Sequence, residues 1–421
     1  MIQMILKNLQ VKDWNQFERV DIDFHPRLTV LTGANGAGKS TILRMFSTQL
    51  GWGYNETAIP SKESTTSLKY KSGGRRKIQP KEQQDKIKIG SLECFNGKTA
   101  NLFVPDLTPS ANYCINYETP GPNYYTNNSL DLKGINIPSH RIAYSYKSVG
   151  NIPVRPASRE EAFSLFNHSL MNKLFESYGD SPSFQMKSTL ISLALFGEGN
   201  SHVNENKEAL DLFLGFIEIL KVLLPPTLGF KKISIRDGEV VLETNSGDFL
   251  LDAVSGGIGA ILDLAWQIYM YDGDKYEPYI VLIDEAENHL HASMQRRLMP
   301  SLLQAFPNAQ FIISTHSPLM VNSVRDSSIF VLKYNENHLV VSELLDFENK
   351  ASNASEILRD VLGVPITMPL WVENKLEEIL QSFKGYEITP ESYSRLKDEL
   401  ATVGLRDHLP QALGILQGGI Y

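Results

Sequence analysis

Nine consecutive residues near the N-terminus carry groups suited to holding a phosphate. The run Gly33-Ala34-Asn35-Gly36-Ala37-Gly38-Lys39-Ser40-Thr41 fits the pattern GxxxxGK[ST]. Glycines let successive backbone N–H groups turn inward around an anion, and the N-terminus of a following helix adds a partial positive charge. Lys39 would reach the β and γ phosphates of a nucleoside triphosphate, and the Ser40 hydroxyl would ligate Mg²⁺. The residues predicted to bind the nucleotide are Gly33, Asn35, Gly36, Ala37, Gly38, Lys39, Ser40 and Thr41.

A second run supplies two carboxylates. The apolar residues 279–283 are followed directly by Asp284 and Glu285. In phosphoryl transfer an acid at this position holds the metal through water, and its neighbour polarises the attacking water. We therefore expect Ser40 and Asp284 to be the metal residues, and Lys39 and Glu285 to belong to the catalytic set.

Two smaller features flank the acidic run. Ser255-Gly256-Gly257 precedes an apolar helix, and His316 follows the apolar residues 310–313. Taken alone, the first is a glycine turn with a helix cap, and the second is a structural histidine at the end of a strand. Their order around Asp284 and Glu285 is also compatible with a role at the phosphates of a nucleotide.

The elements that must position these residues follow from the hydrophobic periodicity. Residues 5–9, 20–24 and 28–31 alternate as strands do, and a helix is expected over 39–50. The runs 279–283 and 310–313 are strongly apolar, which is typical of strands buried on both faces of a parallel sheet.

The middle of the chain shows further signals. We expect a hairpin with Asn96-Gly97 at its turn, a strand over 112–117, and a buried strand over 135–137 that stops at Ser139-His140-Arg141. Helices are expected from 158 to 225, opened by a capping box at Ser158. Three strands are expected at 231–236, 240–244 and 248–251, and amphipathic helices at 353–421 with a break at Lys384-Gly385.

The amino-acid composition limits the classes of protein to which the chain can belong. The chain has 421 residues, a net charge of −8, 42% hydrophobic residues and only two cysteines. These values are ordinary for a globular protein and exclude a disulfide framework or a four-thiolate zinc site. No signal peptide or membrane span is recognisable, so we expect a cytoplasmic protein.

One segment is basic, although the chain as a whole carries a net negative charge. Residues 60–90 hold nine Lys or Arg and three Asp or Glu, and we expect an exposed loop with its tip at 73–77. Such a loop is either a solvated insertion or a contact for nucleic acid or another acidic partner. The sequence does not decide between these two roles of the loop.

The motifs GANGAGKST, VSGGI, VLIDEAENHLH and ISTHSP, in that order, resemble the ABC-type ATPase heads of the OLD (overcoming lysogenization defect), RecF and SMC group. The resemblance is greatest to stand-alone ATPase subunits of prokaryotic anti-phage defence systems such as Septu and PARIS. It covers 1–50 and 230–335, and more weakly 130–165, where the strand and PSHR also look similar. It implies an α/β P-loop NTPase of ABC-ATPase type, a mixed sheet flanked by helices, with an inserted helical lobe and a C-terminal helical region.

The resemblance assigns roles to the remaining motifs. Ser255, Gly256 and Gly257 match the signature that faces the γ-phosphate of ATP bound to a second subunit, although Ile258 stands where Gln is usual. His316 matches the switch histidine that contacts the γ-phosphate. The run 287–291 matches the loop at the dimer interface. Its two histidines are not expected to bind metal, because no third or fourth ligand lies near them in the sequence.

The implied cofactors are ATP and Mg²⁺. The implied partners are a second copy in an ATP sandwich, as a homodimer or a higher oligomer, and a protein effector, either a nuclease or a toxin. Nucleic acid could bind through the basic 60–90 loop, and no membrane is involved. The expected domains are an ATPase core at 1–54 and 230–350, a β-rich insertion at 55–130, a core strand with a helical lobe at 131–229, and a C-terminal helical region at 351–421.

Departures from the family narrow the function. The residues after 350 are too few for a TOPRIM nuclease, and the long region between the motifs lacks coiled-coil heptads. No Q-loop glutamine can be placed, since Gln79, Gln83 and Gln84 lie in the polar insertion. Besides an ATP-driven switch, a DNA-binding repair ATPase of RecF type and an ATP-locked scaffold remain open, and a transporter subunit fits the spacing poorly.

Overall fold

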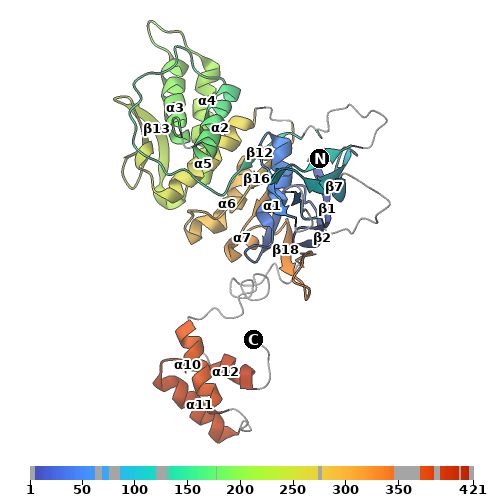
Figure 1. Cartoon of the computed structure of the whole chain (residues 1–421). Helices are drawn as coiled ribbons and strands as arrows, with labels where there is room; N and C mark the ends of the chain where they lie inside the picture. Colours follow the sequence, from blue (N-terminus) through green and yellow to red (C-terminus); the bar gives the residue numbers. More distant parts are fainter. Residues whose placement is uncertain are drawn as a thin grey trace. The chain divides into compact units, whose positions relative to one another are not determined.

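The computed structural model describes residues 5–61, 69–74, 86–119, 130, 132–176, 178–273, 277–345, 370–383, 389–406 and 409–416. The chain divides into two compact units, Met1–Ala351 and Ser352–Tyr421 (Figure 1). The first unit holds the sheet, the flanking helices and every residue predicted above to carry chemistry.

Among the described residues, eleven strands form one sheet in the order β11-β8-β7-β1-β2-β19-β18-β3-β17-β16-β12. The strands are β1 (Leu6–Trp14), β2 (Phe17–Asp23), β3 (Leu28–Gly33), β7 (Lys86–Cys94), β8 (Thr99–Pro105), β11 (Asn116–Glu118), β12 (Gly134–Ile137), β16 (Tyr279–Ile283), β17 (Ala309–Ser314), β18 (Ser328–Tyr334) and β19 (Val340–Leu344). The strands β12, β16, β17, β3 and β18 run parallel, whereas β11, β8, β7, β1 and β2 pair antiparallel.

The parallel strands determine where a ligand can bind. All residues of β3, β16 and β17 are buried, which the apolar runs predicted for β16 and β17 but not for β3. Because these strands are parallel, their carboxyl ends meet at one edge of the sheet, which is where open α/β sheets bind ligands. Gly33 is the last residue of β3, and Asp284 and His316 follow β16 and β17 at this edge.

Helix α1 (Lys39–Ser47) begins at this edge and continues into a 3₁₀ turn, η1 (Thr48–Leu50). Its residues Ile42, Met45 and Phe46 belong to the buried cluster that also contains residues of β1, β7 and β8. The ring of Phe46 meets Phe24 edge-on at 5.5 Å between centroids. This packing fixes the N-terminus of α1, and therefore the loop before it, relative to the sheet.

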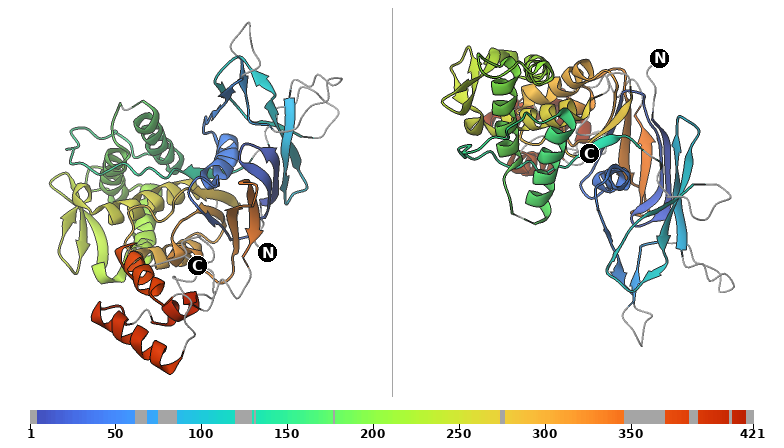
Figure 2. Two further views of the ribbon diagram at one scale, coloured as in Figure 1. Left: turned by 60° about the horizontal axis from the view of Figure 1, so that its bottom comes forward. Right: turned by 90° about the horizontal axis from the view of Figure 1, so that it is seen from above.

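A helical lobe stands beside the sheet and is coloured green to yellow in Figure 2. It contains α2 (Arg159–Phe175), α3 (Pro182–Glu198), α4 (Lys207–Leu223), η2 (Pro226–Leu228) and the meander β13 (Phe230–Arg236), β14 (Glu239–Thr244) and β15 (Phe249–Leu250). The capping box at Ser158 and the three-strand meander are confirmed.

The apolar helix α5 (Gly256–Tyr271) joins the lobe to the sheet. The chain leaves the meander through η3 (Leu251–Ala253) into α5, which contacts α2, α4 and β12. Helices α6 (Ala292–Ala305) and α7 (Pro318–Val321) complete the unit.

One expectation for the insertion is wrong. The predicted strand over 112–117 is two strands, β10 (Asn112–Tyr113) paired with β4 (Glu56–Thr57), and β11 paired with β8. The Asn-Gly hairpin between β7 and β8 is confirmed. Further short strands, β5 (Ile59–Pro60), β6 (Tyr70–Lys71) and β9 (Leu107–Thr108), form a small sheet of their own.

The start of the predicted exposed tip is also held inward. Ser72 and Gly74 are buried, and Gly74 pairs with Trp14. The cause is the buried indole of Trp14, whose Nε1–H needs an acceptor and donates to the carbonyl of Ser72 at 3.1 Å. Residues 75–77, Gln79, Gln83 and Gln84 lie outside the described residues.

The second unit has a small core of its own. Helices α10 (Leu370–Gln381), α11 (Pro390–Thr402) and α12 (Leu409–Leu416) bury Leu376, Leu400 and Ala412 among others. The predicted break at Lys384-Gly385 lies outside the described residues. Within the described part of the chain, no helix combines the length and the apolar character that crossing a membrane requires.

Candidate nucleotide site

The loop between β3 and α1 has the conformation that its glycines predicted. Gly33, Gly36 and Gly38 have φ angles of +131°, +77° and +93°. A Cβ at Gly33 would lie 2.2 Å from the carbonyl oxygen of Leu332, and one at Gly38 would lie 2.4 Å from the Phe17 ring. Backbone angle and packing therefore both require glycine at these two positions. Ala34, Asn35 and Gly36 are exposed at the crest of the loop, while Ala37 is buried beneath it.

Lys39 is folded into this loop. Its Nζ donates to the carbonyl oxygens of Gly33 and Ala34, each at 3.0 Å, and the residue is only 6% exposed. Burial lowers the pKa of Lys39 to about 8, although the carboxylates of Asp284 and Glu287 oppose this shift. A buried ammonium whose hydrogen-bond partners are neutral carbonyls gains from an anion entering the loop, as a phosphate would.

Ser40, Asp284 and Ser314 converge at the carboxyl edge of the sheet. Ser40 Oγ donates to Asp284 Oδ1 at 3.0 Å, and Ser314 Oγ donates to the same oxygen at 2.5 Å. The hydroxyl of Ser314 also accepts the backbone N–H of Glu285 at 2.8 Å. A serine hydroxyl beside a carboxylate is the oxygen set that Mg²⁺ prefers.

A cavity of about 280 Å³ adjoins this pair and is also lined by Asn136, Ser139 and His140. Mg²⁺ dehydrates reluctantly and keeps several waters, so space beside the two protein ligands is part of a magnesium site. The residues present therefore fit Mg²⁺ at Ser40 and Asp284.

Glu285 lies in a turn with an unusual backbone. Its φ is +48°, and its Oε2 accepts a hydrogen bond from Asn288 Nδ2 at 2.8 Å. The same Nδ2 donates to the carbonyl of Ser139 at 3.0 Å. Glu287 holds the neighbouring loop, since its Oε1 accepts the backbone N–H of His316 at 2.5 Å.

His316 is half-buried beside this turn. Burial and the positive charge of Lys39 both lower the pKa of His316, while nearby Glu287 opposes the shift. The imidazole is therefore neutral at physiological pH, with one ring nitrogen able to donate and the other to accept.

The SGG run, Ser255-Gly256-Gly257, does not join the cluster formed by the other predicted residues. Ser255 is the N-cap of α5, but its side chain makes no capping hydrogen bond, and Ser255 and Gly256 are both exposed. Gly257 packs on the turn after β16, where an added Cβ would lie 3.0 Å from the carbonyl oxygen of His289. Lys39, Ser40, Asp284, Glu285 and His316 come together, whereas the SGG run presents its serine outward.

Three residues of the site carried no predicted role. Ser314 lies in ISTHSP and Asn288 in VLIDEAENHLH, but which side chain of a turn faces inward depends on backbone angles that the sequence pattern does not give. The third is Arg141, whose Nη1 donates to the Pro138 carbonyl while Nε and Nη2 are buried without a partner among the described residues. Burial lowers the pKa of Arg141 to about 10, against the attraction of Asp263 and Asp284.

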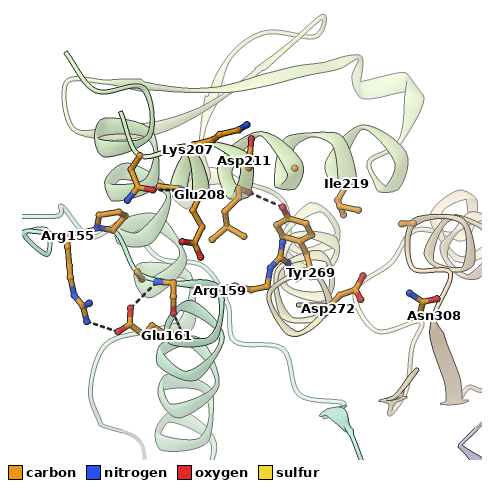
Figure 3. Close-up of a pocket in the computed structure, with 18 of the residues that line it drawn as sticks. Arg155, Arg159, Glu161, Lys207, Glu208, Asp211, Ile219, Tyr269, Asp272 and Asn308 are labelled. Atoms are coloured by element: carbon orange, nitrogen blue, oxygen red, sulfur yellow. Dashed lines mark hydrogen bonds and ion pairs between the residues drawn. The ribbon is translucent and has the colours of Figure 1, made fainter. Parts of the chain in front are cut away.

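A cavity of about 1000 Å³ lies elsewhere, between α2, α4 and α5 (Figure 3). The guanidinium of Arg159 stacks on the Tyr269 ring at 4.3 Å, and the hydroxyl of Tyr269 donates to the Leu212 carbonyl at 3.1 Å. Glu208 and Asp211 line the same cavity, and none of the predicted site residues does. Its mixed charges do not select an anion, so the phosphate loop remains the candidate site.

Known proteins resemble this chain over large parts of its length. Residues 8–119 match a model described as "AAA domain", and residues 147–322 match one described as "AAA domain, putative AbiEii toxin, Type IV TA system". The Septu protein PtuA of Bacillus thuringiensis is 22% identical over 88% of this chain and 87% of its own length. A probable ATPase of retron Ec83 from Escherichia coli is 22% identical over 91% of this chain and 80% of its own length.

Two further similarities are more limited. A probable ATPase of retron Vc95 from Vibrio cholerae is 29% identical, but over 47% of this chain and 39% of its own length. Among solved structures, the SMC head domain from Thermotoga maritima aligns with 82% of this chain at 15% identity and a TM-score of 0.43.

The sequence relatives, the AAA-domain matches and the mixed sheet with its phosphate loop lead to one conclusion. The chain is an ABC-type, nucleotide-binding P-loop ATPase of α/β fold, related to the ATPases of the Septu and retron defence systems.

Proposed function

We propose that this protein is a nucleotide-driven switch that hydrolyses ATP to ADP and phosphate and passes the change in its state to a partner protein. The observation that carries the proposal is the convergence of Ser40 with Asp284 beside the buried amine of Lys39. An anion-binding loop and a pair of metal-ligating oxygens at one sheet edge suit a metal-bound nucleoside triphosphate.

The hydrolysis step follows from the placement of Glu285. Its carboxylate takes a proton from a water as the water oxygen forms a bond to the γ-phosphorus. The bond from that phosphorus to the bridging oxygen breaks, and ADP leaves with the electron pair. Lys39 neutralises charge on the β and γ phosphates, and His316 contacts the γ-phosphate. Mg²⁺ at Ser40 and Asp284 would add charge neutralisation at the phosphates.

A second copy would complete the site. Ser255 and Gly256 are exposed at the N-terminus of α5, and the Ser255 hydroxyl is not used to cap its own helix. A helix N-terminus with free donors attracts a phosphate. We propose that Ser255, Gly256 and Gly257 face the γ-phosphate bound to a second copy, so that ATP binding closes the dimer and hydrolysis opens it.

The output is assigned from the relatives. Proteins similar to this chain over most of their length are described as a Septu protein and a retron ATPase. We propose that this chain likewise serves an anti-phage defence system in the cytoplasm and controls an effector, either a nuclease or a toxin, encoded beside it.

The test is the mass in solution with ATP and Mg²⁺ of the wild type and of Glu285→Gln, each purified with and without the products of neighbouring genes. The proposal expects Glu285→Gln to bind ATP, to stop turnover, and to hold a larger assembly that retains a neighbour. A bare dimer that retains nothing but shifts onto added DNA would instead identify a repair-type ATPase.

Two variants separate the parts of the proposal. Lys39→Ala should abolish nucleotide binding or hydrolysis, and unchanged turnover would remove Lys39 from the mechanism. Ser255→Arg should bind ATP but fail to assemble, whereas full activity in this variant would make the SGG run a structural turn.

A further inference from the structure

We propose that Asn288 is the positioning residue that holds the carboxylate of Glu285 in place for hydrolysis. The inference rests on the proposed function, in which Glu285 activates water. Asn288 touches neither substrate nor metal in this scheme and acts only through Glu285.

Two hydrogen bonds join these residues. The side-chain Nδ2 of Asn288 donates to Glu285 Oε2 at 2.8 Å, and its backbone N–H donates to the Glu285 carbonyl at 3.0 Å. The first bond engages one carboxylate oxygen and leaves the other for water. A carboxylate held in this way does not need to search rotamers at the moment of reaction.

The backbone of Glu285 shows that its position is imposed by its surroundings. A φ of +48° is uncommon for a residue with a Cβ and persists where contacts over-determine it. Those contacts are the Glu285 N–H to Ser314 Oγ at 2.8 Å, the Ala286 N–H to the Ser314 carbonyl at 3.1 Å, and the two bonds of Asn288.

The Asn288 amide is itself anchored. Its Nδ2 also donates to the carbonyl of Ser139 at 3.0 Å, so both of its N–H groups face acceptors. Turning the amide over would place an acceptor oxygen against two other oxygens, and this fixes the orientation of the side chain. Ser139 follows β12, the strand that pairs with β16 ahead of Glu285. Asn288 therefore ties the carboxylate to a rigid sheet edge.

This arrangement gives a role to the loop after β12, which carries the Pro138-Ser139-His140-Arg141 run and for which the sequence predicted none. The loop carbonyl of Ser139 receives the Asn288 amide, and the loop is braced by Arg141, which donates to the Pro138 carbonyl. The loop thus acts as the fixed support for Glu285.

The test compares Asn288→Ala, Asn288→Asp and Asn288→Gln in steady-state ATP hydrolysis. For Asn288→Ala we expect kcat to fall about 10- to 100-fold, the loss of one hydrogen bond to a charged group, with KM changed less than about twofold. Asn288→Asp has the same shape but no donor and adds a like charge, so it should be slower than Asn288→Ala. Asn288→Gln keeps the donor and should recover part of the rate.

The order of the kcat values of the three variants distinguishes a role of Asn288 in holding Glu285 from a role in filling space in the turn. If Asn288 serves only to fill the turn, the isosteric Asp variant should be the most active of the three, and that result would overturn the proposal. Loss of kcat and of nucleotide binding together in all three variants would also overturn it, because the residue would then be structural. Gln304→Ala, which removes an exposed amide on α6, is the matched control and should behave as the wild type.

A second measurement tests whether Asn288 acts through Glu285. Under single-turnover conditions, the slow residual hydrolysis that remains in Glu285→Gln should not fall further when Asn288→Ala is added. Additive losses would contradict this route of action. If the wild type does not hydrolyse ATP, or if Glu285→Gln retains full turnover, the proposed function itself fails. If the wild type hydrolyses ATP, Glu285→Gln does not, and the Asn288 variants match the wild type, then only the inference about Asn288 fails.

Discussion

The hydroxyl of Ser40 donates to Oδ1 of Asp284 at 3.0 Å, although 244 residues separate the two in the chain. The contact joins the helix after the phosphate loop to the end of β16, and it exists because β3 and β16 both flank β17 in one parallel sheet. A local motif is thereby brought to a distant acid, and neither residue alone would hold a hydrated cation.

Ser40→Ala tests this pair. Removing the hydroxyl should raise the Mg²⁺ concentration needed for half-maximal ATP turnover by at least about tenfold, because one oxygen ligand is lost. The measurement is ATP turnover titrated with Mg²⁺. Thr48→Ala removes a hydroxyl that donates to the Met45 carbonyl, outside the phosphate loop, and it should leave the titration unchanged. Equal titrations for Ser40→Ala and the wild type would exclude Ser40 as a ligand.

Two adjacent glycines of the SGG run should respond differently to a methyl group. A Cβ at Gly257 meets the His289 carbonyl at 3.0 Å, whereas the nearest atom to a Cβ at Gly256 is 3.9 Å away. Gly257→Ala should therefore destabilise the protein by about 1–3 kcal/mol, as overpacking does. Gly256→Ala should change the unfolding free energy by less than about 0.5 kcal/mol. Urea denaturation of both variants makes the comparison, and equal losses would mean that the turn yields to the methyl group.

Lys187 on α3 is a buried cation whose loss should be costly. Its Nζ lies 2.5 Å from Asp252, 2.5 Å from Glu239 and 2.9 Å from the Lys147 carbonyl, and the residue is 0% exposed. Burial opposes the charge, yet the hydrogen bonds to Asp252 and Glu239 raise the pKa of Lys187. Lys187→Met leaves two carboxylates unpaired and should destabilise the protein by about 3–5 kcal/mol.

Chemical denaturation compares this variant with a surface control. Lys221→Met removes an exposed partner of Glu218 on α4 and should cost less than about 1 kcal/mol. Since Asp252 lies three residues before Ser255, Lys187→Met should also weaken the ATP-dependent assembly. Wild-type stability in Lys187→Met would show that the cluster does not hold the lobe together.

Asp263 should make stability depend on pH. Burial raises the pKa of Asp263 to about 7, although the hydrogen bond from Tyr144 at 2.7 Å and the charge of Arg141 oppose the shift. The folded state therefore binds a proton more tightly than the unfolded chain, whose aspartates titrate near pH 4. This contribution to stability is fully present below about pH 4 and is lost as the pH rises to about 7, with a slope of at most about 1.4 kcal/mol per pH unit.

Asp263→Asn removes this proton but keeps an oxygen that can accept from Tyr144. The stability of the wild type relative to the variant should fall between about pH 5 and pH 7 and level off above that. Denaturation curves at four pH values give the difference directly. A difference that stays constant across this window would place the proton elsewhere.

Much of the site was predictable because its pieces are contiguous. The phosphate loop needs only local geometry, namely glycines with positive φ between a strand and a helix. The strongly apolar runs predicted the two buried parallel strands, β16 and β17, after which Asp284 and His316 come. The same logic predicted the hairpin at Asn96-Gly97, since turn chemistry is local. It failed at 112–117 and at Gly74, where strand partners and the indole of Trp14 decided the outcome.

The sequence by itself determined which chemical groups are available: a phosphate loop, two acids after a buried strand, and a histidine after another buried strand. Only the tertiary structure decided which groups act together. The bond of Ser40 to Asp284, the hold of Asn288 on Glu285 and the burial of Lys187 each join segments or orient turns through the path of the whole chain. Hydrogen bonds and ion pairs act over a few ångströms, and a linear pattern does not state which distant groups come that close.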